Sequence, residues 1–222
     1  MPTDAIINVN GGAVQTLDIL LLTTVLALLP SLVVLMTSFT RYIVVFSFLR
    51  TAMGTQQTPP NMVLVGMALI LTLFTMSPVL SEVQSEAYDP YVAEEITQEE
   101  FFARAQVPLK RFMLRQTEVS SVELYCNMSG EEMPPTEEAA VELPLRVIMP
   151  AFVTTELKRA FEIGFLLYIP FMLIDIVVSS TLMSMGMIML PPSMISTPFK
   201  ILLFILLDGW QLLFSTLVQG FR

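Results

Sequence analysis

The chain has 222 residues, 54% of them hydrophobic, and a mean hydropathy of +0.70, which is too apolar for an ordinary soluble domain of this length. Its net charge of −9 comes without a basic patch, which argues against nucleic acid as a partner, because phosphates require Lys and Arg. With no histidine and only Cys126 as a cysteine, the sequence offers no Ser/His/Asp or Cys/His arrangement, no internal disulfide and no CxxC or HExxH zinc motif. These absences exclude most hydrolase and zinc schemes, and we predict a membrane-associated protein that is not an enzyme and has no cofactor, with one enzymatic alternative considered below.

An N-terminal segment, residues 1–16, precedes the first apolar block. Its start, MPTDAIINVNGG, lacks the charged n-region of an ordinary signal peptide, so the sequence leaves open whether residue 1 follows a removed signal. We expect this segment to be extracytoplasmic.

Residues 17–81 predict a first hydrophobic helical hairpin. The first run is uncharged from Ile19 to Thr40 and continues to Arg50, and a second run extends from Met62 to Leu80, with TAMGTQQTPPN as a turn between them. Arg41 and Arg50 are the bases near this turn, and the positive-inside tendency places the turn on the cytoplasmic side.

Residues 82–149 predict an acidic, extracytoplasmic helical insert. Between Glu82 and Arg146 there are 14 acids and 5 bases, so the whole net charge belongs to this insert. Thr97 and Glu100 form a capping-box pattern, and we expect the helix that they open to end near Pro108, where a second would begin. An exposed linker is expected from 129 to 142.

Residues 150–222 predict an amphipathic helix followed by a second hydrophobic hairpin. The expected apolar face of the helix holds Val153, Leu157, Ala160, Phe161 and Gly164. The expected polar face holds Glu156, Lys158, Arg159 and Glu162. These charges suit ion pairs within the helix or to a neighbouring subunit, and a helix lying at the membrane surface with its polar face in water is an equal alternative.

The arms of the second hairpin run from Ile163 to about Met183 and from Phe199 to about Phe221. Each arm carries one internal charge near the turn, Asp175 in the first and Lys200 in the second, and an isolated charge at mid-depth costs about 2.5 to 3.5 kcal/mol on insertion scales. This favours an ion pair between the arms or between adjacent copies. Two alternatives stay open: Lys200 reaches toward the interface, or Asp175 carries protons.

The turn of this hairpin, LMSMGMIMLPP, is rich in methionine. Met183, Met185, Met187 and Met189 occupy alternate positions, and Met185, Gly186, Pro191 and Pro192 are the expected turn residues. Methionine is flexible, so such side chains can close around an opening and yield to a passing chain. The competing interpretation is ordinary core packing.

Two other functions remain open from the residues alone. Asp175 and Asp208 lie in consecutive apolar segments, where two carboxyls sharing a proton would suit an aspartyl protease. Asp175, Lys200 and Asp208 would also suit a small transporter or proton channel.

Long motifs of this chain resemble the FliP family of flagellar biosynthetic proteins and its injectisome counterparts. The resemblance rests on TSFTRYIVVFSFLRTAMGTQQTPPN, VLVGMALILTLFTMSPV, PAFVTTELKRAFEIGF, PFMLIDIVVSSTLMSMGMIMLPP and PFKILLFILLDGWQLL, and it covers nearly the whole chain apart from the first dozen residues and roughly 120–142. The RTAMGTQQTPPN loop and the GWQLLFSTLVQGF ending look flagellar rather than injectisome.

The resemblance implies an all-α core subunit of the type III export gate in the bacterial inner membrane and flagellar basal body. Such subunits assemble into a homo-oligomer, by resemblance a pentamer, and into a helical cone with FliQ and FliR, with FlhB as a further partner, and the cone conducts unfolded substrates. Much of that assembly is raised toward the periplasm, so four hydrophobic segments need not cross the bilayer four times. The resemblance further implies a pore constriction at Met187, Ile188 and Met189, an ion pair between Asp175 and Lys200, and subunit contacts from Glu156 to Glu162.

Overall fold

The computed structural model describes residues 7–9, 12–14, 20, 23–24, 27, 31, 34–187 and 189–221. They belong to two units, Met1–Leu35 and Met36–Arg222. In the first unit, β1 (Ile7–Val9) and β2 (Gly12–Val14) pair as an antiparallel hairpin with Ile7 opposite Val14. Ten of the 22 residues between Ile19 and Thr40, in the first predicted apolar run, lie outside the described residues.

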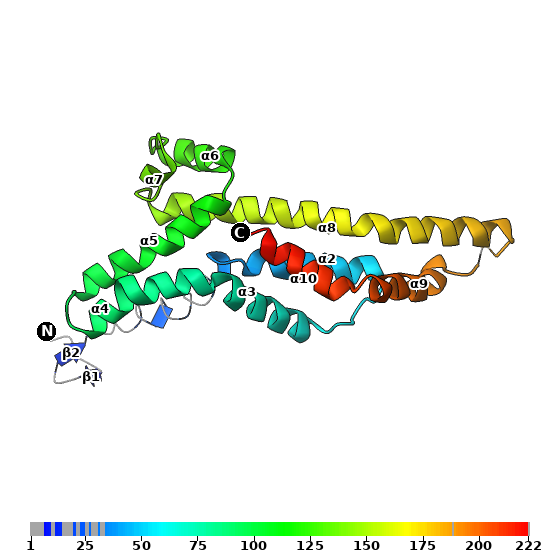
Figure 1. The fold of residues 1–222 in the computed structure, drawn as a ribbon, viewed down its shortest axis with the longest axis horizontal. Coiled ribbons are helices and arrows are strands. Elements are labelled where there is room, and N and C mark those ends of the chain that lie inside the picture. The colour runs from blue at the N-terminus through cyan, green and yellow to red at the C-terminus, as the bar shows by residue number, and fades with distance from the viewer. Residues whose placement is uncertain are drawn as a thin grey trace, which may run out of the picture. The chain divides into compact units, whose positions relative to one another are not determined.

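The second unit is helical, which confirms the predicted all-α class (Figure 1). In chain order its elements are α2 (Phe39–Met53), α3 (Asn61–Val83), the π-helix η1 (Gln84–Tyr88), α4 (Asp89–Val92), α5 (Gln98–Gln116), α6 (Val119–Ser129), α7 (Glu137–Ala140), α8 (Leu145–Ser184), α9 (Pro192–Leu206) and α10 (Gly209–Gln219).

The first core cluster lies where α2 packs against α8 and α10. Tyr42, Val45 and Phe46 of α2 are fully buried there, and Phe46 contacts the ring of Phe214 on α10. Gly164 permits the close approach of α8, because a Cβ at this position would lie 2.5 Å from the ring of Phe48. Helices from both apolar parts of the chain, residues 17–81 and 150–222, therefore pack together around α2.

The second core cluster lies under the insert, where α5 and α6 pack on the first part of α8. The predicted capping box is confirmed: the Glu100 backbone N–H donates to Thr97 Oγ1, and the Thr97 backbone N–H donates to Glu100 Oε2. The predicted helix end near Pro108 is wrong: α5 continues through this buried proline to Gln116. Packing against α8 outweighs the single backbone hydrogen bond that a proline removes.

Helix α8 combines two predicted elements, the amphipathic helix and the first arm of the second hairpin. It begins at Leu145, ahead of the expected Pro150, and runs for 40 residues without a break. At 1.5 Å per residue it is about 60 Å long, roughly twice the thickness of a hydrocarbon core. One bilayer therefore cannot enclose all of α8.

The buried face of α8 is rotated from the predicted one. Leu157 and Phe161, expected inside, are 37% and 56% exposed, whereas Glu156, expected outside, is fully buried. Ala160 and Gly164 are buried as predicted. The prediction of the two faces uses hydropathy alone, which places every charged residue outside. Glu156 is buried instead because it forms an ion pair, described below.

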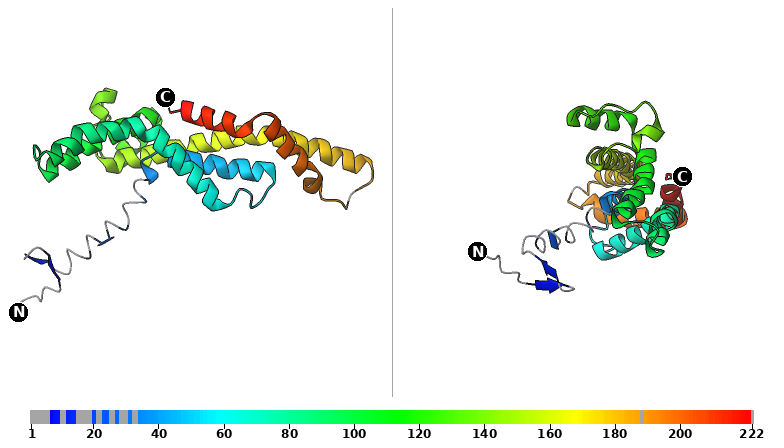
Figure 2. Two further views of the ribbon diagram at one scale, coloured as in Figure 1. Left: turned by 60° about the horizontal axis from the view of Figure 1, so that its bottom comes forward. Right: turned by 90° about the vertical axis from the view of Figure 1, so that its left-hand side faces the viewer.

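The predicted apolar segment from Phe199 to Phe221 is also divided differently. α9 begins at Pro192, directly after the turn, and ends at Leu206, and α10 follows at an angle of 63°. Asp208, between them, has left-handed backbone angles of φ 48° and ψ 46°. Figure 2 shows this bend between the two helices.

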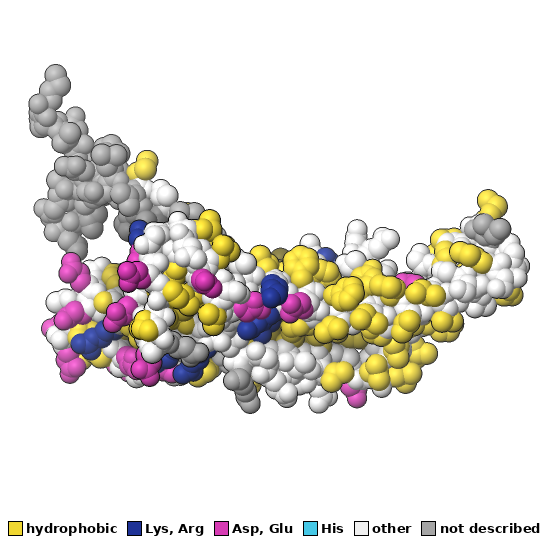
Figure 3. Space-filling model, turned by 90° about the horizontal axis from the view of Figure 1, so that it is seen from above, with side chains coloured by type: hydrophobic (Ala, Val, Ile, Leu, Met, Phe, Trp, Pro, Cys, Tyr) yellow, Lys and Arg dark blue, Asp and Glu magenta, His cyan; other side chains and the backbone are white. Residues whose placement is uncertain are grey.

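Two stretches of the described residues are long and apolar enough to span a membrane. They are 61–92, which comprises α3, η1 and α4, and 145–184, which is α8; the bent pair α9 and α10 makes a third if it counts as one span. On the face of the molecule in Figure 3, charged side chains gather over the insert, and apolar side chains cover the length of α8 beyond it.

Candidate functional site

The methionine-rich turn begins where Gly186 ends α8. Gly186 has φ 77°, its N–H donates to the carbonyl of Met183 at 3.0 Å, and the N–H of Met187 donates to the carbonyl of Leu182 at 3.0 Å. These two bonds form a Schellman motif, which terminates helices at a left-handed residue. Pro192 at the first turn of α9 starts the returning arm, so the turn is defined at both ends.

The methionine side chains of this turn are mostly uncovered in the single chain. Met189 is 98% exposed, Met183 and Met185 are about two-thirds exposed, and Met187 is half-buried. Ile188 lies outside the described residues. Core packing, the competing interpretation of the methionines, is therefore not seen for Met183, Met185 or Met189 within the single chain.

Asp175 and Lys200 lie together within one chain. Lys200 Nζ is 2.6 Å from Asp175 Oδ2 and also donates to the Ala52 carbonyl at 3.1 Å, and Ser196 Oγ donates to Asp175 Oδ1 at 2.6 Å. The lysine side chain is 5% exposed and the aspartate side chain 36%. This cluster, the hairpin pair, ties α8 and α9 to the end of α2.

A second ion pair lies deeper and joins residues that the sequence analysis did not connect. Arg41 Nε donates to Glu156 Oε2 at 2.7 Å, its Nη2 also bonds Oε1 of the same carboxylate, and both side chains are almost completely buried. The same guanidinium donates to Gln116 Oε1 and to the Gly220 carbonyl, and it lies 3.6 Å from the ring centroid of Phe221. We call this cluster the junction pair, because it connects α2, α5, α8 and the segment after α10.

Sequence reasoning missed the junction pair although a signal was present. Arg41 is a single base in a long apolar run, as Lys200 is, and the argument that led from Lys200 to an acid applies equally to Arg41. Because Arg41 is buried in this ion pair, it no longer supports the positive-inside prediction for the α2–α3 turn. Arg50 is the base that remains for that prediction.

The remaining members of the predicted polar face of α8 lie elsewhere. Lys158 Nζ pairs with Glu118 at 2.8 Å, on the insert, and this hydrogen bond lowers the pKa of the Glu118 carboxyl. Arg159 donates to Gln116 Oε1 at 3.1 Å, and Glu162 is exposed. Within one chain this face therefore binds the insert; the predicted contacts with a neighbouring subunit stay a prediction.

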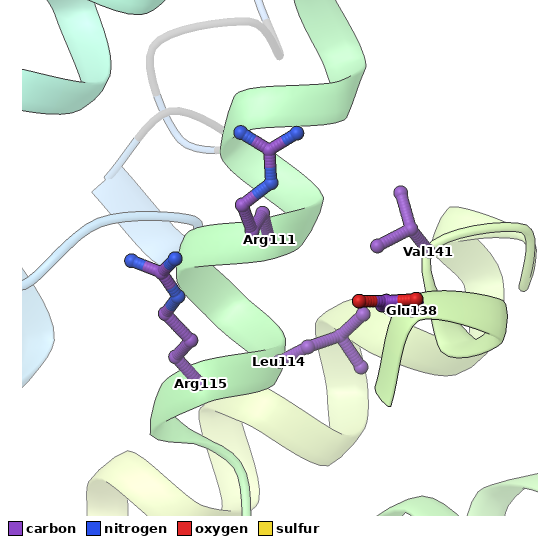
Figure 4. Close-up of a pocket in the computed structure, with 5 residues that line it drawn as sticks. All are labelled: Arg111, Leu114, Arg115, Glu138 and Val141. Atoms are coloured by element: carbon purple, nitrogen blue, oxygen red, sulfur yellow. The ribbon is translucent and has the colours of Figure 1, made fainter. Parts of the chain in front are cut away.

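A hollow of about 430 Å³ lies beside α5, and it gathers none of the predicted site residues. Figure 4 shows the five residues that line it: Leu114 points toward Glu138 and Val141, and Arg111 and Arg115 also project from α5. Arg111 is bound to Glu82 at 3.0 Å. We assign no chemistry to this hollow.

The aspartate dyad considered above does not form in the described structure. Asp175 pairs with Lys200, and Asp208 lies two helical turns beyond Lys200, roughly 12 Å away along the helix axis. Among the described residues no group of three His, Cys, Asp or Glu side chains is placed to hold a metal ion. Fold and site together define a helical, membrane-type protein with a methionine-bearing hairpin tip and two buried ion pairs.

Comparison with known proteins identifies the family. The model of the FliP family matches residues 22–217. The chain is 47% identical to the flagellar biosynthetic protein FliP of Aquifex aeolicus (96% of this chain, 89% of the relative), 48% to that of Bacillus subtilis (93% and 92%) and 50% to that of Pectobacterium carotovorum (96% and 82%). The chain belongs to the FliP family, as the motifs predicted, and is a component of the flagellar export apparatus.

Proposed function

We propose that the protein is a noncatalytic, pore-forming core subunit of the flagellar type III export gate. Several copies, by resemblance a pentamer, assemble with FliQ and FliR in the inner membrane at the basal body and contact FlhB. The assembly conducts unfolded flagellar proteins, and much of it lies toward the periplasm. Residues 17–81 and 150–222 supply its hydrophobic hairpins, and residues 82–149 supply an extracytoplasmic insert.

The observation that supports this proposal is the exposed methionine tip. A methionine that is 98% exposed at a turn adds nothing to the packing of its own chain, and flexible apolar side chains are suited to sealing an opening that must yield. Met187, Ile188 and Met189 of adjacent copies would form the constriction. Asp175 and Lys200 would hold the turn in place.

The wide exposed apolar surface supports an obligate assembly. Helix α3 alone exposes Met62, Ile70, Leu73 and Phe74 to more than half of their area, and α8 and α9 expose comparable faces. Patches of this extent mark lipid or protein contacts. The length of α8 argues that part of this surface is covered by protein, because a single bilayer does not enclose it.

Ion conductance of the purified complex tests the constriction. Replacing both Met187 and Met189 by alanine should raise ion leakage while the complex stays assembled, because the seal loses its side chains. Met172→Ala on α8 is the matched control and should leave leakage unchanged. Equal leakage in intact complexes of all three proteins would favour core packing over a gate.

A further inference from the structure

In the apolar half of the chain, residues 17–81 and 150–222, Arg50 and Asp208 lie at the helix turns and have no partner of opposite charge among the described residues; Arg159 and Glu162, on the polar face of α8, also form no ion pair there. Arg50, at the end of α2, donates only to the neutral oxygens of Pro59 and Asn61. Asp208, at the bend between α9 and α10, is exposed and makes no side-chain hydrogen bond or ion pair within the described structure. The other charges buried in this half, Arg41, Glu156 and Lys200, are all paired.

Arg50 and Asp208 both adjoin one apolar groove in the sequence. Their neighbours in the sequence, Leu49 and Gly209, line this groove of about 310 Å³. Arg50 donates to Asn61 at the start of α3, and Asp208 lies at the surface. Within one chain, therefore, Arg50 and Asp208 adjoin the same groove but make no contact with each other among the described residues.

Each charge borders an apolar surface. Beside Arg50, the start of α3 exposes Met62 and Val63, and beside Asp208 the helix ends expose Leu206 and Leu207. A carboxylate at the centre of an apolar face is costly to cover unless the covering surface brings a cation. The face around Arg50 meets this requirement because it carries the opposite charge beside exposed apolar side chains.

We propose that Asp208 of one copy pairs with Arg50 of the next copy. This head-to-tail contact packs the α9–α10 bend of one subunit against the α2–α3 turn of its neighbour, and the ion pair fixes the register of the two apolar faces. A contact between two different faces propagates from copy to copy and builds a ring or a helix. The inference rests on the oligomer of the proposed function.

The backbone at Asp208 does not by itself require a carboxylate. Left-handed angles are tolerated by asparagine as well as by aspartate, and the carboxylate makes no cap hydrogen bond with α10. Asp208→Asn is therefore a matched variant that keeps the bend and removes only the charge.

Charge exchange between co-expressed chains tests the pairing. Asp208→Arg alone and Arg50→Asp alone should each lower the multimer fraction by roughly tenfold, because like charges would meet in the interface. Co-expression of the two single variants should recover the multimer, since each chain then presents its reversed charge to the other. Asp208→Asn and Arg50→Gln should weaken assembly less than the reversals while leaving helix content unchanged.

The outcomes separate the pairing from its alternatives. Unchanged multimers of Asp208→Arg would show that the carboxylate is simply solvated or faces another subunit, and would overturn the proposal. Rescue in the doubly reversed single chain without rescue on co-expression would indicate a pair within one chain and would also overturn it. If the native chain itself forms no multimer, the proposed function fails, whereas a native multimer indifferent to these variants refutes only the pairing.

Discussion

The junction pair and the hairpin pair both join α8 to α2, yet they differ in their surroundings. At the junction pair, both Arg41 and Glu156 are enclosed, and the guanidinium is surrounded by acceptors and an aromatic ring. At the hairpin pair, Lys200 is enclosed but Asp175 retains contact with the outside. The first arrangement suits a fixed connection, and the second suits a connection near a part of the chain that must adapt.

The largest expected effect comes from breaking the junction pair. Glu156→Gln leaves a buried guanidinium without its counter-charge, so we expect the free energy of unfolding to fall by about 3–5 kcal/mol. Denaturant unfolding in detergent measures this loss. The double variant Arg41→Met with Glu156→Leu removes both charges and should lie within about 2 kcal/mol of the native chain. A double variant as unstable as Glu156→Gln would show that the network, and not the uncompensated charge, carries the stability.

The hairpin pair should respond asymmetrically to the loss of either partner. Asp175→Asn strands the buried Lys200 ammonium and should cost about 2–3 kcal/mol, whereas Lys200→Met leaves a carboxylate that keeps Ser196 and water and should cost about 1 kcal/mol. The same unfolding measurement applies to both variants. Equal losses would mean that Asp175 is as enclosed as Glu156, and the contrast between the two pairs would disappear.

The two pairs also differ in whether the sequence predicts them: the pairing of Asp175 with Lys200 is among the expectations from the sequence, and the pairing of Arg41 with Glu156 is not. The all-α class, the capping box and the family followed from hydropathy, from local patterns and from long motifs. The junction pair did not, because Arg41 and Glu156 are far apart in the chain and only tertiary packing brings Gln116 and Phe221 beside them. The continuity of α5 and α8 was missed for a related reason, since packing held the helices through prolines that usually end them.

A smaller effect is expected at the turn beyond the hairpin pair. Gly186→Ala forces a side chain into left-handed backbone angles, although no atom lies within 4 Å of the added Cβ, so the cost is purely conformational and about 1 kcal/mol. Gly66→Ala, within α3 and also free of contacts, is the control and should stabilise by about 0.5–1 kcal/mol. Thermal unfolding of the two variants gives the comparison. If Gly186→Ala were neutral, the Schellman turn would not be fixed in the chain.

The smallest effect is expected at the surface pair of Lys158, on α8 just beyond Glu156, and Glu118, at the start of α6; this pair serves as a surface reference for both buried pairs. The hydrogen bond from Lys158 holds the pKa of Glu118 below its ordinary value, so its contribution to stability is present above that ordinary value and is lost as the pH falls through the lowered pKa. Lys158→Ala should return the Glu118 pKa toward the ordinary range, measured by carboxyl chemical shifts during a pH titration, with little change in stability. An unchanged Glu118 pKa would show that Lys158 and Glu118 do not remain paired in solution. This pair could then not serve as the surface reference for the junction pair and the hairpin pair.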